Sequence, residues 1–251
     1  MKIACLMPTY NRIPHKQNLI EEALHSFLLQ DYENRELIIC NDTPNQRLHF
    51  NDEIFGDKVV IQNLDERFPT LSDKIQFMID SSDADAFCRW DDDDISLPHR
   101  LTYSANKIRN DLEWRAENYF YCPPEETILT SGVGNTHTMS LWKREVLEQF
   151  PDGKYPQKAS GWEDQQFNIL LSQSGINSSG ELLSADDIFY LYRWGVSDRH
   201  LSGTGGGNLG LQNHWNKIGQ QEIVEGDFEL DPHWAEDYLL RAREAAGACS
   251  V

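Results

Sequence analysis

The chain has 251 residues, of which 39% are hydrophobic and 11% aromatic, and this composition excludes an intrinsically disordered protein. Its length allows one large domain or two small ones. Its formal net charge of −19 argues against a general binder of nucleic acid or anionic membranes, because those surfaces repel an acidic protein at long range.

The first part of the chain alternates between short apolar runs and segments of helical periodicity. The predicted strands are residues 3–7, 36–40, 58–63 and 86–90, and the predicted helices are residues 18–30 and 71–79. This alternation predicts the α/β class, with an open, mostly parallel, Rossmann-like central sheet flanked by helices.

The rest of the chain is less regular. Its predicted helices are residues 97–109, 143–150, 163–172 and 234–246, and its predicted strands are residues 119–122, 127–129, 136–142 and 189–194. The glycine-rich residues 203–207 predict a mobile loop. Because the sequence has neither an internal repeat nor an inter-domain linker, we expect a single domain.

Polar side chains follow three of the predicted strands. Thr9 and Tyr10 come after the first strand, Asp42 after the second, and four consecutive aspartates, residues 91–94, after the fourth. Ligands of open α/β sheets bind outside the carboxyl ends of the strands. We therefore expect these side chains to border one crevice.

The aspartates at residues 91–94 form an acidic cluster that favours a bound cation. Carboxylates within about 4–6 Å of one another repel unless a positive charge offsets them, and Mg²⁺ and Mn²⁺ bind carboxylate and phosphate oxygens. A solvated acidic turn is the alternative. An EF-hand fits poorly, because the loop positions that need Gly and Glu hold Ser96 and Thr102.

The cysteines and the absence of long apolar runs bear on localisation. The five cysteines are widely spaced and form no Cys-x-x-Cys pair, which indicates a reducing compartment. Pro8 interrupts the first apolar run too early for a signal peptide, and no run reaches the ~20 apolar residues of a membrane span. We therefore expect a cytoplasmic protein without a transmembrane segment.

Four segments of the sequence carry a family resemblance. They are Pro-Thr-Tyr-Asn-Arg at residues 8–12, residues 26–42, Trp-Asp-Asp-Asp-Asp at residues 90–94 followed by Pro98, and Gly-Trp-Glu-Asp at residues 161–164. In this order and spacing they resemble a family 2 glycosyltransferase of the GT-A fold, over roughly residues 1–205. The resemblance implies a hexosyl- or pentosyltransferase that uses a nucleotide-diphosphate sugar. A UDP-sugar is the expected donor, and the transfer to an acceptor hydroxyl inverts the anomeric carbon.

The resemblance assigns donor-binding roles to residues near the first two strands. Thr9 and Tyr10 match the loop that borders the nucleoside, and Asp42 matches the acid that hydrogen-bonds the donor base. The family's usual Gly-Ser turn after this acid is replaced here by Thr-Pro-Asn at residues 43–45. Lys74 falls where relatives carry an arginine directed at the phosphates. The alternatives are a turn-capping role for Asp42 and a surface position for Lys74.

The resemblance also places a metal at the aspartates. Asp91 is expected to face the ribose and to help Asp93 hold a Mn²⁺ or Mg²⁺ ion that bridges the two phosphates and stabilises the departing diphosphate. Side chains alternate along a strand, so Asp91 and Asp93 are expected on one face, with Asp92 pointing away. Arg193 and His200 resemble a segment that closes over the donor. His200 is a further candidate metal ligand, with a structural or exposed histidine as the alternative.

On the acceptor side, the resemblance identifies Asp164 as the catalytic base, which takes the proton of the acceptor hydroxyl. Glu163 and Trp162 precede it and are expected near the acceptor, where Trp162 offers an apolar platform for a sugar ring. The alternatives are that the two acids only favour a helix N-terminus through its dipole, and that Trp162 is a core residue.

The resemblance divides the chain into three parts. Residues 1–94 are the expected nucleotide-binding half and residues 95–205 the acceptor half of one GT-A domain. Residues 206–251 are a C-terminal extension, a glycine-rich loop followed by a helix, for which acceptor specificity or a contact in a homo-oligomer is expected. The acceptor is open among a glycan, a lipid-linked sugar, a protein, a small molecule and a modified DNA base.

Two other functions compete with a glycosyltransferase. A sugar-phosphate nucleotidyltransferase usually has a glycine-rich, basic loop after the first strand, and residues 8–14 are Pro-Thr-Tyr-Asn-Arg-Ile-Pro instead. A catalytically silent nucleotide-sugar or carbohydrate-binding module would not need both the aspartate cluster and Asp164. The sequence therefore favours the enzyme.

Overall fold

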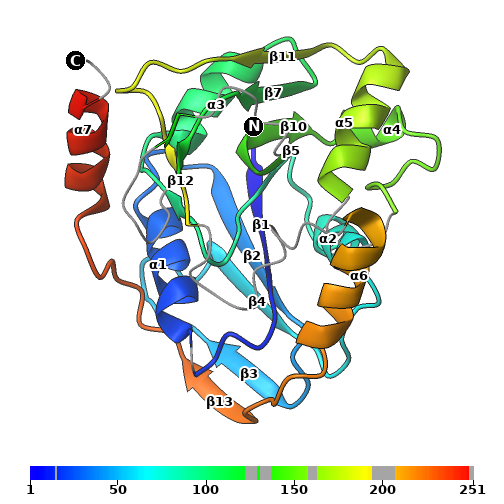
Figure 1. Cartoon of the computed structure of the whole chain (residues 1–251), viewed down its shortest axis with the longest axis vertical. Helices are drawn as coiled ribbons and strands as arrows, with labels where there is room; N and C mark the ends of the chain where they lie inside the picture. Colours follow the sequence, from blue (N-terminus) through cyan, green and yellow to red (C-terminus); the bar gives the residue numbers. More distant parts are fainter. Residues whose placement is uncertain (15, 122–128, 131–136, 158–162, 194–206, 249–251) are drawn as a thin grey trace.

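The computed structural model describes residues 1–14, 16–121, 129–130, 137–157, 163–193 and 207–248. Within these residues the central sheet has seven strands in the order β11-β7-β10-β5-β1-β2-β4 (Figure 1). They are β1 (Ile3–Thr9), β2 (Arg35–Asn41), β4 (Val59–Asn63), β5 (Ala86–Arg89), β7 (Glu113–Ala116), β10 (Ser140–Lys143) and β11 (Ser178–Glu181). Only β10 runs antiparallel to its neighbours. The predicted α/β class with a mostly parallel sheet is confirmed.

Helices cover both faces of this sheet, as Figure 1 shows with α1 and α7 on one side and α2, α4, α5 and α6 on the other. Their bounds are α1 (Gln17–Leu28), α2 (Leu71–Asp80), α3 (Arg100–Ile108), α4 (Glu145–Glu148), α5 (Glu163–Ser174), α6 (Gly207–Ile218) and α7 (Tyr238–Ala248). Because side chains alternate along a strand, β1 contributes to two cores. Ile3, Cys5 and Met7 pack with α1, α3 and α7, whereas Ala4 and Leu6 pack with α2, α4, α5 and α6.

Two smaller sheets flank the central one. The first contains β6 (Ile95–Ser96), β12 (Tyr190–Tyr192), β8 (Phe120–Tyr121) and β9 (Leu129–Thr130). The second joins β3 (Gln46–His49) to β13 (Gly226–Glu229) in parallel. The C-terminal part of the chain therefore pairs directly with the N-terminal half, and it contains α6 and β13 in addition to the one helix expected.

Several predicted boundaries differ from the observed ones for local reasons. The predicted helix 97–109 begins only at Arg100, because the Leu97 N–H donates to the Phe189 carbonyl and Pro98 follows. The predicted strand 136–142 starts as a 3-10 turn, His137–Met139, before β10. Helix α2 begins as predicted, with Thr70 as its cap.

Two further expectations concern cysteines and membranes. Cys5, Cys40 and Cys88 are buried free thiols within β1, β2 and β5. Across the part of the chain that the structure describes, none of the helices has the length and apolarity needed to cross a membrane.

Candidate functional site

The carboxyl ends of three parallel strands meet at one edge of the central sheet. Thr9 at the end of β1 lies beside Asn41 at the end of β2, and Leu6 of β1 lies beside Arg89 at the end of β5. The polar residues that follow these strands are therefore neighbours, as the crevice rule predicts.

Asp42 and Lys74 form a buried ion pair at this edge. Lys74 Nζ donates to Asp42 Oδ1 and to the Thr9 carbonyl, both at 2.6 Å, and the Lys74 side chain is 1% exposed. The other Asp42 oxygen accepts from the Phe68 N–H at 2.9 Å. The surface position considered for Lys74 is therefore wrong. Its ammonium group is buried, pairs with Asp42 and hydrogen-bonds the backbone of β1 at Thr9.

The loop after β1 is fixed by a turn that suits its sequence. Asn11 has a φ of 50°, a left-handed conformation that asparagine tolerates better than most residues. Its N–H donates to Thr43 Oγ1 at 2.7 Å, and its side-chain amide donates to the Glu222 carbonyl at 2.9 Å. The Tyr10 ring, which is 8% exposed, stacks on the guanidinium of Arg67 at 4.1 Å.

Arg12 joins two of the four aspartates. Its Nε and Nη2 donate to the two oxygens of Asp92 at 2.9 and 2.7 Å, and Nη2 also donates to Asp93 at 2.7 Å. Burial alone would lower the pKa of Arg12, but the two carboxylates raise it above its ordinary value. Arg12 thus supplies a positive charge to this part of the acidic cluster.

The aspartate side chains do not alternate between two faces of a strand, so that prediction is wrong. Strand β5 ends at Arg89, before the aspartates, so the two-residue repeat does not extend to them. Asp92 and Asp93 share Arg12, whereas Asp91 accepts from Arg89 at 2.7 Å and from Thr138 at 3.2 Å. Asp92 is therefore part of the same ion-paired cluster as Asp93.

Asp94 and Arg193 take part in a buried network with α1 and α7. Asp94 accepts from the Tyr190 hydroxyl at 2.5 Å and from the Arg193 N–H at 2.7 Å. The Arg193 guanidinium donates to the Asp93 carbonyl at 2.5 Å and to the Glu22 carboxylate. Arg193, which was predicted to bind the donor, thus contacts both Asp93 and Asp94 inside this buried network.

Asp164 lies in the first turn of α5, beside Glu163. Burial raises the pKa of Asp164 to about 7, and the negative charge of Glu163 acts in the same direction. Its Oδ1 accepts from the Gln165 N–H at 2.6 Å. A carboxylate with such a pKa is well suited to accept a proton near neutral pH.

Arg89 connects the aspartates to α5. Its guanidinium lies 2.7 Å from Asp91 Oδ1 and 3.6 Å from Glu163 Oε1, and it is buried. One guanidinium therefore lies between Asp91 of the acidic cluster and Glu163, the residue that precedes the predicted base Asp164. Trp162 and His200, also predicted for this region, lie outside the described residues.

Sequence reasoning gave no role to three arginines that the structure brings to this edge: Arg12, Arg67 and Arg89. A signal existed for Arg89, because an arginine inside an otherwise apolar strand needs a buried acidic partner. Arg67 lies in a polar loop, where nothing in the pattern distinguishes it from a solvated arginine.

The aspartates can be compared with the ligands that a divalent ion needs. Within the described ranges, no three His, Cys, Asp or Glu side chains form a metal-binding group. Mg²⁺-type ions, however, are commonly held by one or two carboxylates, with the rest of the shell from water and substrate phosphates. Asp91, whose side chain is 22% exposed, and Asp93, which also pairs with Arg12, are carboxylates of this kind, so their chemistry fits such an ion.

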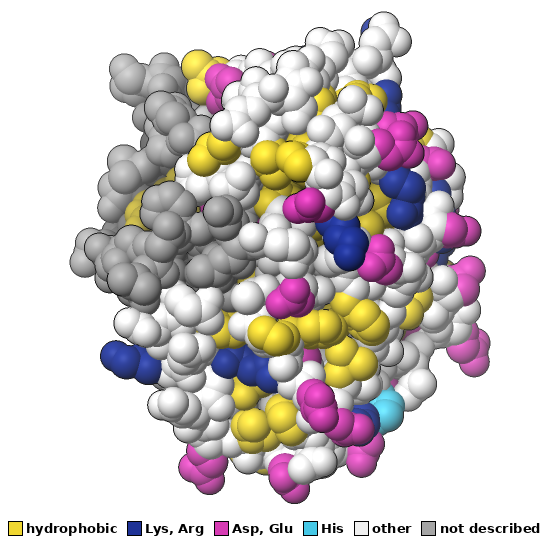
Figure 2. All heavy atoms as spheres, turned by 90° about the vertical axis from the view of Figure 1, so that its right-hand side faces the viewer, with side chains coloured by type: hydrophobic (Ala, Val, Ile, Leu, Met, Phe, Trp, Pro, Cys, Tyr) yellow, Lys and Arg dark blue, Asp and Glu magenta, His cyan; other side chains and the backbone are white. Residues whose placement is uncertain are grey.

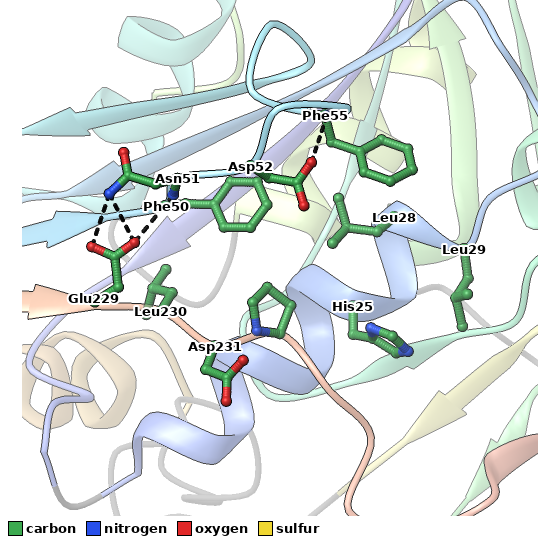
Figure 3. A pocket seen from close by; sticks show the side chains of 11 residues that line it. His25, Leu28, Leu29, Phe50, Asn51, Asp52, Phe55, Glu229, Leu230 and Asp231 are labelled. Atoms are coloured by element: carbon green, nitrogen blue, oxygen red, sulfur yellow. Dashed lines mark hydrogen bonds between the residues drawn. The ribbon is translucent and has the colours of Figure 1, made fainter.

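A surface pocket of about 580 Å³ lies away from this edge (Figure 3). It opens between the C-terminal part of α1 and the segments around β3 and β13, and Leu28, Phe50 and Phe55 provide much of its apolar wall. None of the predicted site residues is among the side chains that line it.

Several solved structures have a similar fold. S. aureus TarS matches with a TM-score of 0.57 and 15% identity, over 77% of this chain and 37% of TarS. Its fragment 1–349 in complex with UDP-GlcNAc has the same TM-score and 16% identity, over 77% of this chain and 58% of the fragment. Mannosyltransferase PcManGT from Pyrobaculum calidifontis, in complex with GDP-Man and Mn²⁺, has a TM-score of 0.54 and 14% identity, over 99% of this chain and 74% of the mannosyltransferase.

At these identities the likeness establishes the fold, which is that of the GT-A glycosyltransferases. The chain spans only 37% of the length of TarS and 60% of its fragment. Residues 4–113 match the model of Glycosyl transferase family 2. The resemblance drawn from the sequence is confirmed, and the same findings support an enzyme of the glycosyltransferase class. No curated protein matches the sequence.

Proposed function

We propose that this chain is an inverting glycosyltransferase that moves a sugar from a nucleotide-diphosphate sugar to an acceptor hydroxyl. The observation that carries the proposal is the connection between Asp164 and the aspartates. A carboxyl group whose pKa is raised to about 7 lies in the same turn as Glu163, and Arg89 joins Glu163 to Asp91. This supports placing the proposed base beside the proposed diphosphate-binding region, as a single displacement requires.

In the proposed reaction, deprotonated Asp164 takes the proton of the acceptor hydroxyl as its oxygen attacks the anomeric carbon. The bond from this carbon to the diphosphate oxygen breaks, and its electron pair leaves with the nucleoside diphosphate. The attack comes from the face opposite the leaving group, so the configuration inverts. One base suffices, because the diphosphate leaves without protonation by a second carboxyl group.

Asp91 and Asp93 are the proposed ligands of a Mn²⁺ or Mg²⁺ ion, which when bound would stabilise the negative charge on the departing diphosphate. Arg12 has a separate role. By binding both oxygens of Asp92 and one of Asp93, it keeps neighbouring carboxylates at fixed positions that their mutual repulsion would otherwise disturb.

The nucleoside is proposed to lie over Thr9 and Tyr10, with Asp42 directed at its base. Among the described residues, the buried Asp42 carboxylate accepts one hydrogen bond from Lys74 and one from the Phe68 N–H, and a carboxylate has about four acceptor sites. It therefore retains capacity for an N–H of the base. TarS in complex with UDP-GlcNAc and PcManGT in complex with GDP-Man support a nucleotide-diphosphate sugar, and we propose a UDP-sugar as the first donor to test.

A thermal-denaturation screen of UDP- and GDP-sugars with Mn²⁺ tests this proposal. A donor present at 100 times its Kd should stabilise the fold by about 2.7 kcal/mol, or roughly 5–10 °C for a chain of this size. Stabilisation by one donor and not by its free sugar would support the proposal. If every nucleotide sugar leaves the melting temperature unchanged, the chain does not bind such donors and the proposal is wrong.

A further inference from the structure

The Arg67 guanidinium is held between two aromatic rings at the edge where the donor is proposed to bind. It lies 4.1 Å from the centre of the Tyr10 ring and 4.0 Å from that of Trp215 in α6. Tyr10 belongs to the loop after β1, and Trp215 lies beyond residues 4–113, which match the family model. Two distant segments of the chain therefore fix one arginine.

The segment after Trp215 fixes the orientation of this guanidinium. Arg67 Nη1 donates to the Trp215 carbonyl at 2.8 Å. Gly219 approaches so closely that a Cβ placed there would lie 2.1 Å from the same nitrogen. The Gly219 carbonyl also lies 3.5 Å from the Tyr10 hydroxyl. Any larger residue at position 219 would have to displace the guanidinium.

The opposite edge of the guanidinium carries two donors that no described residue accepts. Arg67 Nε and Nη2 are buried, and among the described residues neither has a hydrogen-bond partner. A buried donor without an acceptor is costly, so native proteins rarely keep one without a purpose. Both unpaired nitrogens belong to the same fork, which donates two parallel hydrogen bonds.

Arg67 is also next to the proposed base-binding acid. The N–H of the following residue, Phe68, donates to Asp42 Oδ2 at 2.9 Å, so Asp42 and Arg67 are joined through one peptide unit. The two residues offer complementary groups, a carboxylate that accepts and a fork that donates. A nucleotide that reaches Asp42 would therefore meet the fork of Arg67.

We propose that Arg67 is a donor-binding residue whose Nε and Nη2 donate to two neighbouring acceptor atoms of the nucleotide, and that Trp215 and Gly219 hold it in that orientation. This inference rests on the proposed function. Two sources of such acceptors exist in a nucleotide sugar, namely the edge of a base such as guanine, with O6 and N7, and the oxygens of the diphosphate. The C-terminal extension then contributes to the donor site.

Calorimetric titration of the full chain with UDP and GDP tests the assignment. Arg67→Met keeps an unbranched side chain between the rings but removes the fork, and it should weaken binding of the nucleotide that the wild type prefers by at least about tenfold. Arg67→Lys keeps the charge without the fork and should restore little of the affinity. The matched control is Arg47→Met, which removes an arginine that pairs with exposed Asp65 and should leave binding unchanged.

A second variant leaves the arginine in place. Gly219→Ala should displace the guanidinium and weaken binding by a similar factor, whereas Gly247→Ala, where an added Cβ meets nothing within 4 Å, should have no effect. Melting curves of all variants identify any that fail to fold. If Arg67→Met does not fold, the comparison of Gly219→Ala with Gly247→Ala still tests the proposal.

Titrations with uridine, guanosine and inorganic pyrophosphate identify the source of the acceptors. A loss of nucleoside binding in Arg67→Met assigns the fork to the base, and a loss confined to pyrophosphate and the diphosphates assigns it to the phosphates. Wild-type affinity in both Arg67→Met and Gly219→Ala overturns the inference alone. If the wild-type chain binds neither UDP nor GDP, the proposed function fails together with it.

Discussion

At the scale of single residues, Asp164 determines how activity should depend on pH. Only its deprotonated form accepts a proton, and burial raises its pKa to about 7. We expect kcat/KM for the acceptor to rise about tenfold per pH unit below this value and to level off above it. The measurement is a pH profile between about pH 5 and pH 9. A flat profile over this range would exclude a base with this pKa.

The raised pKa of Asp164 should also affect stability, and here a rise in pH has the opposite effect to the one it has on activity. The pKa of Asp164 is raised from 3.8 in the folded state, so this carboxyl binds its proton more tightly when the protein is folded. Its stabilising contribution is complete below pH 3.8 and is lost as the pH rises to about 7. A rise in pH through about 7 should thus increase the activity that depends on Asp164 and decrease its contribution to stability.

Arg12 provides a second prediction at this scale. Arg12→Met leaves the buried carboxylates of Asp92 and Asp93 without their arginine, and losing one partner of a buried ion pair costs about 3–5 kcal/mol. Urea denaturation should show a decrease of this size in the free energy of unfolding. Arg47→Met, at a more exposed ion pair, should cost less than about 1 kcal/mol. Equal costs for the two variants would show that Arg12 does not stabilise the aspartates.

The sequence indicated the acidic residues of this site better than the basic ones. Asp42, the aspartates and Asp164 follow strand ends or begin a helix, positions that a pattern reveals. Arg12 and Arg67 were given no role, because their partners Asp92 and Trp215 lie far away in the chain and no local spacing encodes those contacts.

At the scale of elements, the contact between α1 and α7 can be tested through one hydroxyl group. The Tyr238 hydroxyl donates to Glu22 Oε1 at 2.9 Å and accepts from Arg193 Nη1 at 3.1 Å. Tyr238→Phe leaves both partners buried with one fewer hydrogen bond, so the free energy of unfolding should fall by about 1–3 kcal/mol.

The matched control for this variant is Tyr32→Phe, whose hydroxyl donates to the Met1 carbonyl at an exposed position. Its loss should be small, because water replaces the bond. Chemical denaturation of both variants makes the comparison. If Tyr238→Phe is as stable as Tyr32→Phe, the buried network does not fasten α7 to α1.

The elements that the sequence revealed are those with an apolar signature. Strands β1, β2, β4 and β5 are apolar enough to stand out, and α1 and α2 show helical periodicity. Strands β3, β7, β11 and β13 were missed, because their sequences are polar and their position depends on partners from elsewhere in the chain. The glycines that predicted a loop at 203–207 also concealed the start of α6 at Gly207.

At the scale of the whole molecule, the sequence has a formal net charge of −19. On the face shown in Figure 2, lysine and arginine side chains lie among aspartates and glutamates. Lys143 and Arg144, two adjacent basic residues of the expected acceptor half, donate to the backbone carbonyls of Arg109, Ala84 and Ser82. These contacts do not favour a phosphate-binding role for the pair.

Metal removal should separate activity from global stability. If a divalent ion acts mainly on the diphosphate, EDTA should lower turnover at least about tenfold, and Mn²⁺ should restore it. The melting temperature without donor should not change, because Arg12 already pairs with Asp92 and Asp93. Turnover and melting curves with and without EDTA check both statements. A large fall in melting temperature on metal removal would instead show a structural ion.

The central claim is that Asp164 is the base of a nucleotide-sugar-dependent transfer, and the most direct test is the rate at which Asp164→Asn releases nucleoside diphosphate from the donor selected by the thermal screen. Removing a general base typically costs a factor of about 10²–10⁴. We predict a loss of at least about 100-fold with unchanged donor affinity, while the exposed-residue control Asp152→Asn keeps the wild-type rate. Release by Asp164→Asn at the wild-type rate would contradict the account.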